Sequence, residues 1–150
     1  MTGRYFEDFE VGEVFLTRGV TVTESMIIDF ACRYDPQPIH MDAEAAKATH
    51  FNGLIASGFQ TLVLAGRLFL SEQIFATTGM GSPGMDEVRW LLPVRPGDTL
   101  HVKAEILSSR PSSSRTDRGY VGMIYRVYNQ KDDLVMSYKV MQIIARRQDS

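Results

Sequence analysis

The feature that most constrains the fold is a long apolar segment that runs from Ser57 to about Thr77, just before Gly79. Its apolar side chains are spread around most of a helical circumference, and a helix of this length would span roughly 30 Å. Because a helix that is apolar on most sides has to be buried, we predict one long, largely buried helix with Gly79 as its stop signal. Gly66 lowers helix propensity in the interior, which indicates that another backbone approaches it closely.

The residues after Asp86 change from a helical to a strand pattern. Apolar and polar residues alternate there with a period of two, which is typical of strands with one buried face. The segment 96–98, Pro-Gly-Asp, has the composition of a turn, and the serine-rich segment 108–119 is expected to be a loop or a mobile hairpin tip. The strands predicted from this pattern are 87–92, 100–106, 121–127 and 134–140, with a hairpin connection at 129–133.

The N-terminal part of the chain predicts a short strand at 14–16 followed by two short helices. Thr23 is a credible N-cap for the first helix, and Pro36 requires that helix to end near Tyr34. Asp42 is a good N-cap for the second helix. Taken with the long helix and the later strands, these elements predict an α+β domain in which an antiparallel sheet packs on one central helix.

The composition is that of an ordinary globular protein with a single domain at 1–150. The chain has 150 residues, of which 44% are hydrophobic and 23% charged, so a full apolar core is available. The net charge of −2 gives no indication of nucleic acid or a membrane surface as a partner. The lone Cys32 excludes an intrachain disulfide and a cysteine cluster for zinc, and its apolar helical setting predicts a buried, inert thiol. No signal-peptide pattern is present at the N-terminus, so we expect a cytoplasmic location.

The segment 35–40, Asp-Pro-Gln-Pro-Ile-His, carries the residue types best suited to chemistry. Its two prolines have a fixed φ and bias the residues before them toward extended backbone, so we predict a stiff, non-helical loop. Asp35 and His40 are then a carboxylate and an imidazole held in place before a substrate arrives, as general acid–base catalysis requires. The alternative is a turn aspartate and a surface histidine.

A glycine-containing segment leads into the long helix and supplies a different chemical group. The backbone N–H groups in the first turn of a helix have no partner within the helix, and the helix dipole is positive there. The N–H of Gly58 is therefore well placed to stabilise a carbonyl oxygen that gains negative charge, as an oxyanion hole does. The alternative is that Gly53 and Gly58 only allow the chain to turn and pack.

The segments at 35–40 and 53–58, followed by the long apolar helix, together resemble the MaoC-like dehydratases, the family of the R-specific enoyl-CoA hydratases (hydratase 2). The resemblance extends from Tyr5-Phe6 to the turn at 94–100 and thus covers nearly the whole chain. It implies a hotdog fold, in which a curved antiparallel sheet wraps around a long helix, and this agrees with the pattern of elements described above.

The resemblance also implies an activity, which is the reversible hydration of a 2-enoyl-CoA to the (R)-3-hydroxyacyl-CoA. The family's catalytic Asp and His fall on Asp35 and His40, and its backbone oxyanion donor falls on Gly58. No cofactor is implied, because coenzyme A enters as part of the substrate. We expect His40 to act as the base and Asp35 as the acid, although such a pair titrates as a unit.

Further residues are expected to contact the substrate. Gln37 stands where the family more often has Asn, and Ser57 stands where many members have His, so both could influence acyl-group preference. Ser57 is also a helix cap by its position. The aromatic residues Tyr34 and Phe59, with Phe30 and Trp90, could line an acyl tunnel, and ordinary core packing is the alternative.

Other functions and partners stay open at this stage. A hotdog thioesterase commonly needs a carboxylate on or near the central helix, and here none occurs before Glu72. A non-catalytic acyl-CoA-binding subunit is a third possibility. Arginines 110, 115 and 118 could meet coenzyme A phosphates or could simply belong to a solvated loop. The resemblance implies a homodimer or larger homo-oligomer, and the open edge of an antiparallel sheet is compatible with pairing.

Overall fold

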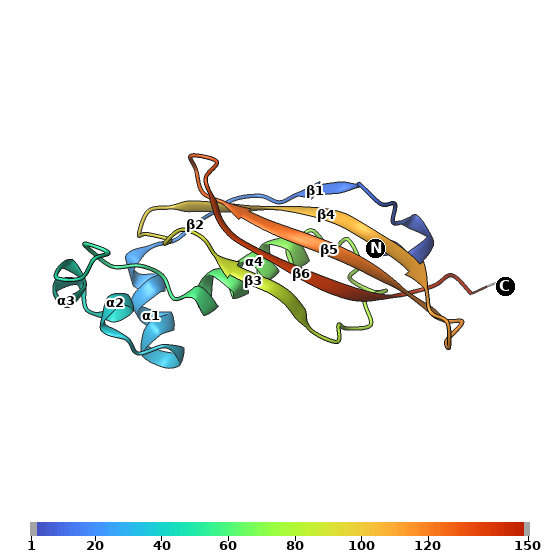
Figure 1. The fold of residues 1–150 in the computed structure, drawn as a ribbon, viewed down its shortest axis with the longest axis horizontal. Helices are drawn as coiled ribbons and strands as arrows, with labels where there is room; N and C mark the ends of the chain where they lie inside the picture. Colours follow the sequence, from blue (N-terminus) through green and yellow to red (C-terminus); the bar gives the residue numbers. More distant parts are fainter. Residues whose placement is uncertain (1–2, 149–150) are drawn as a thin grey trace.

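A computed structural model gives the structure of the protein, and it describes residues 3–148 (Figure 1). A single 3₁₀ turn near the N-terminus precedes the first strand, three short helices lie between the second strand and the main helix, and four strands complete the chain. In chain order the elements are η1 (Phe6–Asp8), β1 (Val14–Leu16), β2 (Val20–Thr21), α1 (Glu24–Tyr34), α2 (Pro38–Met41), α3 (Ala43–Lys47), α4 (Gly58–Ser71), β3 (Met85–Trp90), β4 (Thr99–Pro111), β5 (Arg118–Tyr128) and β6 (Leu134–Ala145).

The strands form one six-stranded antiparallel sheet with the order β1-β4-β5-β6-β3, in which β2 also pairs with β4. The long strands β4, β5 and β6 are joined by hairpins and run side by side along the length of the molecule (Figure 1). Helices α1, α2 and α3 lie together at one end of the molecule. The strands β1 and β3 are the two outer strands of this order, so each has an edge without a neighbouring strand among residues 3–148.

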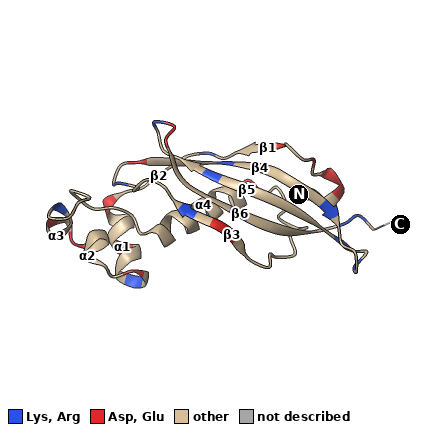
Figure 2. Cartoon of the chain, in the orientation of Figure 1, with Lys and Arg blue, Asp and Glu red and all other residues tan. Residues whose placement is uncertain are grey.

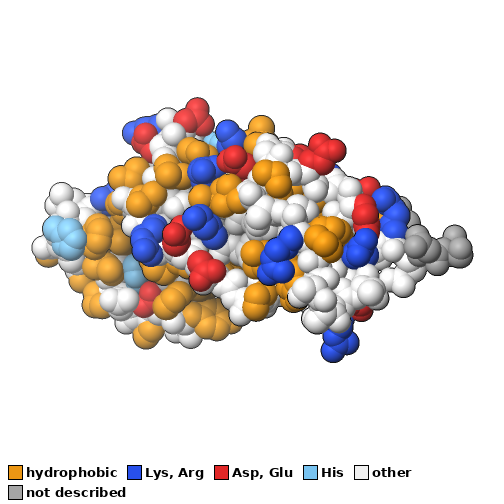
Figure 3. All heavy atoms as spheres, turned by 45° about the vertical axis from the view of Figure 1, so that its right-hand side comes forward, with side chains coloured by type: hydrophobic (Ala, Val, Ile, Leu, Met, Phe, Trp, Pro, Cys, Tyr) orange, Lys and Arg blue, Asp and Glu red, His pale blue; other side chains and the backbone are white. Residues whose placement is uncertain are grey.

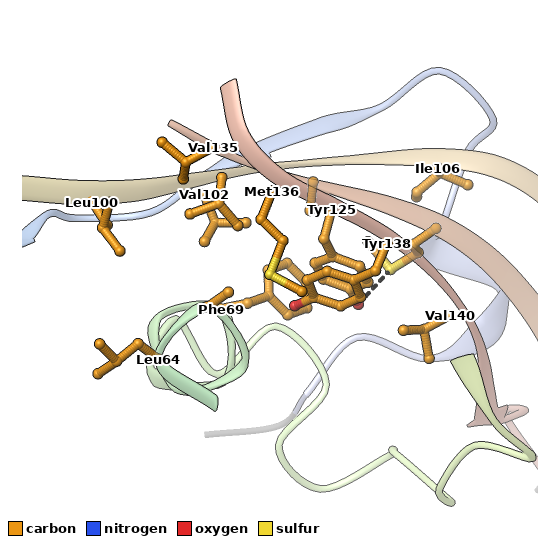
Figure 4. Packing of buried hydrophobic residues seen from close by; sticks show 14 of the residues in the cluster. Leu64, Phe69, Leu100, Val102, Ile106, Tyr125, Val135, Met136, Tyr138 and Val140 are labelled. Carbon is orange, nitrogen blue, oxygen red and sulfur yellow. Dashed lines mark hydrogen bonds between the residues drawn. The ribbon is translucent and has the colours of Figure 1, made fainter. Parts of the chain in front are cut away.

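Helix α4 packs against one face of the curved sheet, and the predicted hotdog fold is confirmed. Phe69 of α4 contacts the ring of Tyr125 edge-on, with ring centroids 5.0 Å apart, and Tyr125 stacks on Tyr138 of the next strand (Figure 4). The alternation predicted from the sequence places one side of each long strand in this core. Its fully buried members on the sheet include Leu100, Val102, Ala104, Ile106, Val121, Val127 and Met136.

Several local predictions for the N-terminal part are confirmed. The strand at Val14–Leu16 is present, Thr23 caps α1 by accepting the Met26 N–H, and α1 ends at Tyr34. Asp42 caps α3 by accepting two backbone N–H groups. At Thr23 and Asp42 a side chain bonds to backbone a few residues away, so the signal for these two caps is contained in the local sequence.

The prediction of a non-helical loop over residues 35–40 is only partly correct. Asp35 and Gln37 have extended or other non-helical backbone, whereas Pro38 is the first residue of the short helix α2. A proline is well accommodated there, because its missing N–H would have no partner in the first turn of a helix. His40 is therefore held by one turn of helix, which keeps its ring direction fixed relative to Asp35.

The predicted C-terminal end of the long helix is wrong, because α4 ends at Ser71 and not near Thr77. Gln73 has a positive φ of 54°, which a right-handed helix cannot contain. The chain turns there and brings Phe75, which is 8% exposed, back against Phe9 and Phe69. Burying this aromatic side chain in the core is thus the reason that the helix stops early.

The predicted burial of this helix is also wrong for one of its faces. Phe59, Val63 and Leu70 of α4 are 57%, 60% and 62% exposed, although Leu64 and Phe69 on the other face are buried. The close backbone approach expected at Gly66 is not found within the described chain, where a Cβ at this glycine would have no neighbour within 4 Å. We call Phe59, Val63 and Leu70 the α4 stripe.

Three smaller expectations need correction. Cys32 is exposed and not buried, because it lies on the solvent side of α1. Half of the segment 108–119 is strand, since β4 and β5 extend into it and only residues 112–117 connect them. Strand β3 begins and ends two residues before the predicted bounds, and it contains a bulge at Glu87, where φ is 50°.

Charged residues of both signs are interspersed along the sheet (Figure 2). The β4–β5 hairpin, which carries arginines 110, 115 and 118, lies at the opposite end of the molecule from α1, α2 and α3 (Figure 1). Arg118 bonds its neighbour Asp117, and Arg110 lies over the ring of Tyr120. Within the described residues, no helix is long and apolar enough to cross a membrane.

Replacing Phe69 tests whether the contact between α4 and the sheet holds the domain together. The Phe69→Ala variant should lose about 3–5 kcal/mol of unfolding free energy, because it leaves a cavity among three aromatic rings. Urea unfolding followed by circular dichroism measures this loss. Leu107→Ala, on the exposed side of β4, is the control and should change the unfolding free energy far less. Equal effects of the two substitutions would contradict this packing of α4 on the sheet.

Candidate active site

Asp35 is the residue that follows the last residue of α1, and in space it lies beside the start of α4. Its backbone is outside the helical region, with φ −153° and ψ 72°. One carboxylate oxygen accepts a hydrogen bond from Gln37 Nε2 at 2.7 Å, and the other accepts one from Ser57 Oγ at 2.7 Å. Both partners are donors, so this carboxylate is built to act as an acceptor.

These contacts determine the charge of the Asp35 side chain. The hydrogen bond from Gln37 is the largest influence on its pKa and outweighs the opposing effect of burial. The hydroxyl of Ser57 and the neighbouring His40 act in the same direction, and together they hold the pKa of Asp35 below its ordinary value of 3.8. Asp35 is therefore an ionised carboxylate at neutral pH, although only 13% of its side chain is exposed.

The His40 ring is held by a backbone contact on the side that faces away from Asp35. It is 5% exposed, and its Nδ1 lies 2.8 Å from the carbonyl oxygen of Ile55. Because a carbonyl only accepts hydrogen bonds, Nδ1 must carry a proton. The other ring nitrogen, Nε2, then faces Asp35 Oδ2 at 3.3 Å. The backbone carbonyl of Ile55 thus leaves Nε2 as the imidazole nitrogen that is free to react.

Ser57 joins the carboxylate to the main helix. Its side chain is completely buried, donates to Asp35 and accepts the Phe59 N–H at 3.2 Å as the N-cap of α4. The predicted cap is therefore confirmed. The same hydroxyl fixes the position of Asp35 relative to the first turn of α4.

The N–H of Gly58 is the third element. Gly58 is the first residue of α4, and the part of the chain that the structure describes offers its N–H no hydrogen-bond acceptor. The glycine lines a cavity that also contains Asp35 and His40. An unpaired donor at the positive end of a helix is suited to an oxygen that becomes negatively charged.

This cavity has a volume of about 490 Å³ and is mainly apolar. It lies between the segment at 35–40, the start of α4 and the residues that follow β3. Apart from the polar groups already described, the lining consists of Phe51, Ile55, Ala56, Phe59, Thr61, Trp90, Leu91, Leu92, Pro93 and Val94. A space of this size with a few polar groups on one side is typical of a small-molecule site.

The structure brings together most of the residues predicted from the sequence. Asp35, Gln37, His40, Gly58 and Phe59 all line the cavity. The substrate-contacting roles predicted for two other residues find no support in the geometry. Ser57 has no exposed surface, and Tyr34 is 67% exposed but is not part of the lining.

Sequence reasoning missed the wall formed by Leu91, Leu92 and Pro93. The signal was present, because two consecutive leucines after Trp90 break the alternation of a strand. Nothing in the local sequence, however, shows that this segment lies against the start of α4.

The Asp35 carboxylate, the His40 imidazole and the free N–H of Gly58 thus line one cavity of a hotdog domain. A family model described as "MaoC like domain" matches residues 8–124, and the chain belongs to this family. YdeM of Bacillus subtilis, described as uncharacterized, is 33% identical over 140 residues, which is 93% of this chain and 98% of that protein.

Two further relatives carry functional names. The 3-hydroxybutyryl-CoA dehydratase of Methylorubrum extorquens is 32% identical over 118 residues, which is 74% of this chain and 69% of that protein. The crystal structure of the MaoC-like dehydratase from Rhodospirillum rubrum superposes with a TM-score of 0.87 at 35% identity, and covers 98% of this chain and 100% of that one. The family thus includes proteins named as dehydratases.

The charge of Asp35 can be tested through the pH dependence of stability. A lowered pKa in the folded state means that the ionised carboxylate contributes stability above the ordinary value of 3.8, and that this contribution is lost as the pH falls through the lower folded value. The difference in unfolding free energy between the wild type and Asp35→Asn should therefore be constant at neutral pH and shrink in acid. Urea unfolding of both proteins across this range measures it, and a pH-independent difference would contradict the assignment.

Proposed function

We propose that this protein is a hydro-lyase that adds water reversibly to a 2-enoyl-CoA and forms the (R)-3-hydroxyacyl-CoA. The observation that carries the proposal is the arrangement around one cavity of the Asp35 carboxylate, His40 Nε2 at 3.3 Å from it, and the free N–H of Gly58. The name of the related 3-hydroxybutyryl-CoA dehydratase supports a coenzyme A thioester as substrate. Coenzyme A belongs to that substrate, and the proposed steps use no further cofactor.

The hydration places specific demands on the site. A water oxygen has to bond to C3 of the enoyl group while a proton reaches C2, and negative charge develops on the thioester oxygen in between. The Gly58 N–H would stabilise this oxygen as the oxyanion donor. One such donor typically contributes about 10²–10³ in rate. The apolar lining residues, such as Phe51 and Leu92, would accommodate the acyl chain.

The hydrogen bonds favour a division of proton transfer opposite to the one expected from the sequence. Asp35 accepts from two donors and is ionised, so we assign it as the base that takes a proton from water. Hydroxide then bonds to C3, while the proton on Asp35 passes to the free Nε2 of His40 across the 3.3 Å between them. His40 Nε2 gives this proton to C2, which restores the starting state of both groups.

A thioesterase is the second enzyme class to be separated from this proposal. The carboxylate that follows the central helix, Glu72, lies at its C-terminal end and accepts the Arg18 N–H. At 1.5 Å per residue this is about 20 Å along the helix from Gly58. The geometry therefore favours the hydro-lyase.

The proposed roles are tested with Asp35→Asn and His40→Gln. Each should lower kcat for a short 2-enoyl-CoA by about 10²–10⁴, because each removes a proton-transfer group, with little change in the circular dichroism spectrum. Loss of the conjugated enoyl thioester absorbance measures the reaction, and release of free thiol detects a thioesterase. Asp29→Asn, on the exposed side of α1, is the control and should retain activity. Near-wild-type activity of either site variant, or thiol release in place of hydration, would refute the proposal.

We also propose that the protein forms a homodimer through the α4 stripe and the neighbouring edge of β3. Val63 and the rest of the stripe are exposed in the single chain, as is Trp90 at the end of β3. Phe59 and Trp90 contact each other at 6.4 Å between ring centroids, so the helix and the strand form one apolar surface. Figure 3 shows hydrophobic side chains gathered on the left-hand half of the molecule in that view. Exposed apolar surface of this kind is typical of interfaces.

Substitution with Glu tests the interface. Val63→Glu should convert the dimer to a monomer, because it places charges at the centre of an apolar interface, and sedimentation equilibrium measures the mass. Leu16→Glu is the matched control, since Leu16 is 66% exposed on β1 at the other side of the sheet. A dimer broken by Leu16→Glu and not by Val63→Glu would place the interface at the β1 edge. A monomeric wild type at micromolar concentration would show that no such dimer forms.

A further inference from the structure

Trp90 is the residue that encloses the cavity next to the proposed oxyanion donor. It is the last residue of β3, and its indole Nε1–H donates a hydrogen bond of 2.8 Å to the carbonyl oxygen of Gly58. Its ring also meets Phe59 edge-on at an interplanar angle of 88°. These two contacts hold the indole in one orientation, although the residue is half exposed.

The indole explains why residue 58 is a glycine. Gly58 is the first residue of α4 and is not among the glycines with positive φ, so its backbone conformation is open to any residue. A Cβ at this position would lie 2.6 Å from Trp90 Nε1 and 2.7 Å from Trp90 Cε2. The glycine is therefore required for space and not for conformation, because the indole lies directly against its Cα.

This contact places an aromatic wall beside the proposed oxyanion donor. If the Gly58 N–H binds the thioester oxygen, the carbonyl carbon and C2 are one and two bonds from that oxygen and therefore lie near the indole. Leu91 and Leu92, which also line the pocket, belong to the same segment as Trp90. The space around C2 is therefore bounded by a large side chain that cannot withdraw without losing its hydrogen bond.

We propose that Trp90 is a specificity-determining residue, which admits enoyl thioesters with hydrogen at C2 and excludes those that carry a branch there. This inference rests on the proposed function for the identity of the ligand, and it concerns a residue that takes no part in proton transfer. A single methyl group is the difference between the two substrate classes, and one carbon in a tight pocket typically changes specificity by about 10–200-fold.

Binding of saturated thioesters tests the wall without any turnover. Butyryl-CoA and 2-methylbutyryl-CoA differ only by the methyl group at C2, and neither can be hydrated. Trp90 is the only tryptophan of the chain, so its fluorescence reports the cavity directly. The wild type should bind butyryl-CoA at least about tenfold more tightly than 2-methylbutyryl-CoA, with a change in emission. By calorimetry, Trp90→Ala should bind the two equally, whereas Trp90→Phe, which keeps a ring without the N–H donor, should retain part of the preference.

Three results would overturn the assignment. The first is equal binding of the two thioesters by the wild type, the second is an unchanged ratio in Trp90→Ala, and the third is binding of neither with no change in emission. Turnover of crotonyl-CoA and 2-methylcrotonyl-CoA gives the separate test of the proposed function. Selective binding without hydration of crotonyl-CoA by the wild type would support the wall and refute the hydro-lyase.

A stability cycle tests the steric contact by itself. Gly58→Ala should lower the melting temperature by several degrees in the wild type, and by much less in a Trp90→Ala background, because the added methyl group then has space. Such coupling between neighbouring residues is what a double-mutant cycle measures. Equal losses in the two backgrounds would show that the glycine is needed for another reason and would remove this support for the wall.

Discussion

The hydrogen bond from Ser57 Oγ to Asp35 Oδ2 is the contact on which the candidate site depends. It connects the end of α1 to the start of α4, two segments that the chain brings together only by folding. The same hydroxyl accepts the Phe59 N–H, so one buried group both begins the main helix and orients the carboxylate. Because the first turn of α4 also presents the Gly58 N–H, the groups proposed for acid–base chemistry and for charge stabilisation are positioned by the same helix start.

Helix α4 has two apolar faces with different roles. One face, with Leu64 and Phe69, packs on the sheet and completes the core. The other is the α4 stripe, which the single chain leaves exposed next to the cavity. The segment is apolar all round because a helix in this position has two partners to meet, the sheet of its own chain and, in the proposed dimer, a second copy. In the proposed dimer, the site would lie where the core and the interface meet.

The elements that depend on neighbouring residues were predicted well from the sequence. The caps at Thr23 and Asp42 and the end of α1 before Pro36 could be recognised because their hydrogen bonds or steric limits span only a few positions. The end of α4 could not, since it is set by the burial of Phe75 against distant aromatic rings. The exposure of Cys32 was missed for a related reason, because which face of a helix is buried depends on the elements that pack against it.

The sequence by itself determined the composition of the site: a carboxylate and an imidazole on a proline-containing segment, and a glycine at the start of an apolar helix. It also determined the family, because motif and order of elements agree. Only the tertiary structure decided how these groups act. The carbonyl of Ile55 selects the free nitrogen of His40, and donors from two segments keep Asp35 ionised. It also placed Trp90 against Gly58. These contacts join residues far apart in the chain, and no local pattern encodes their distances.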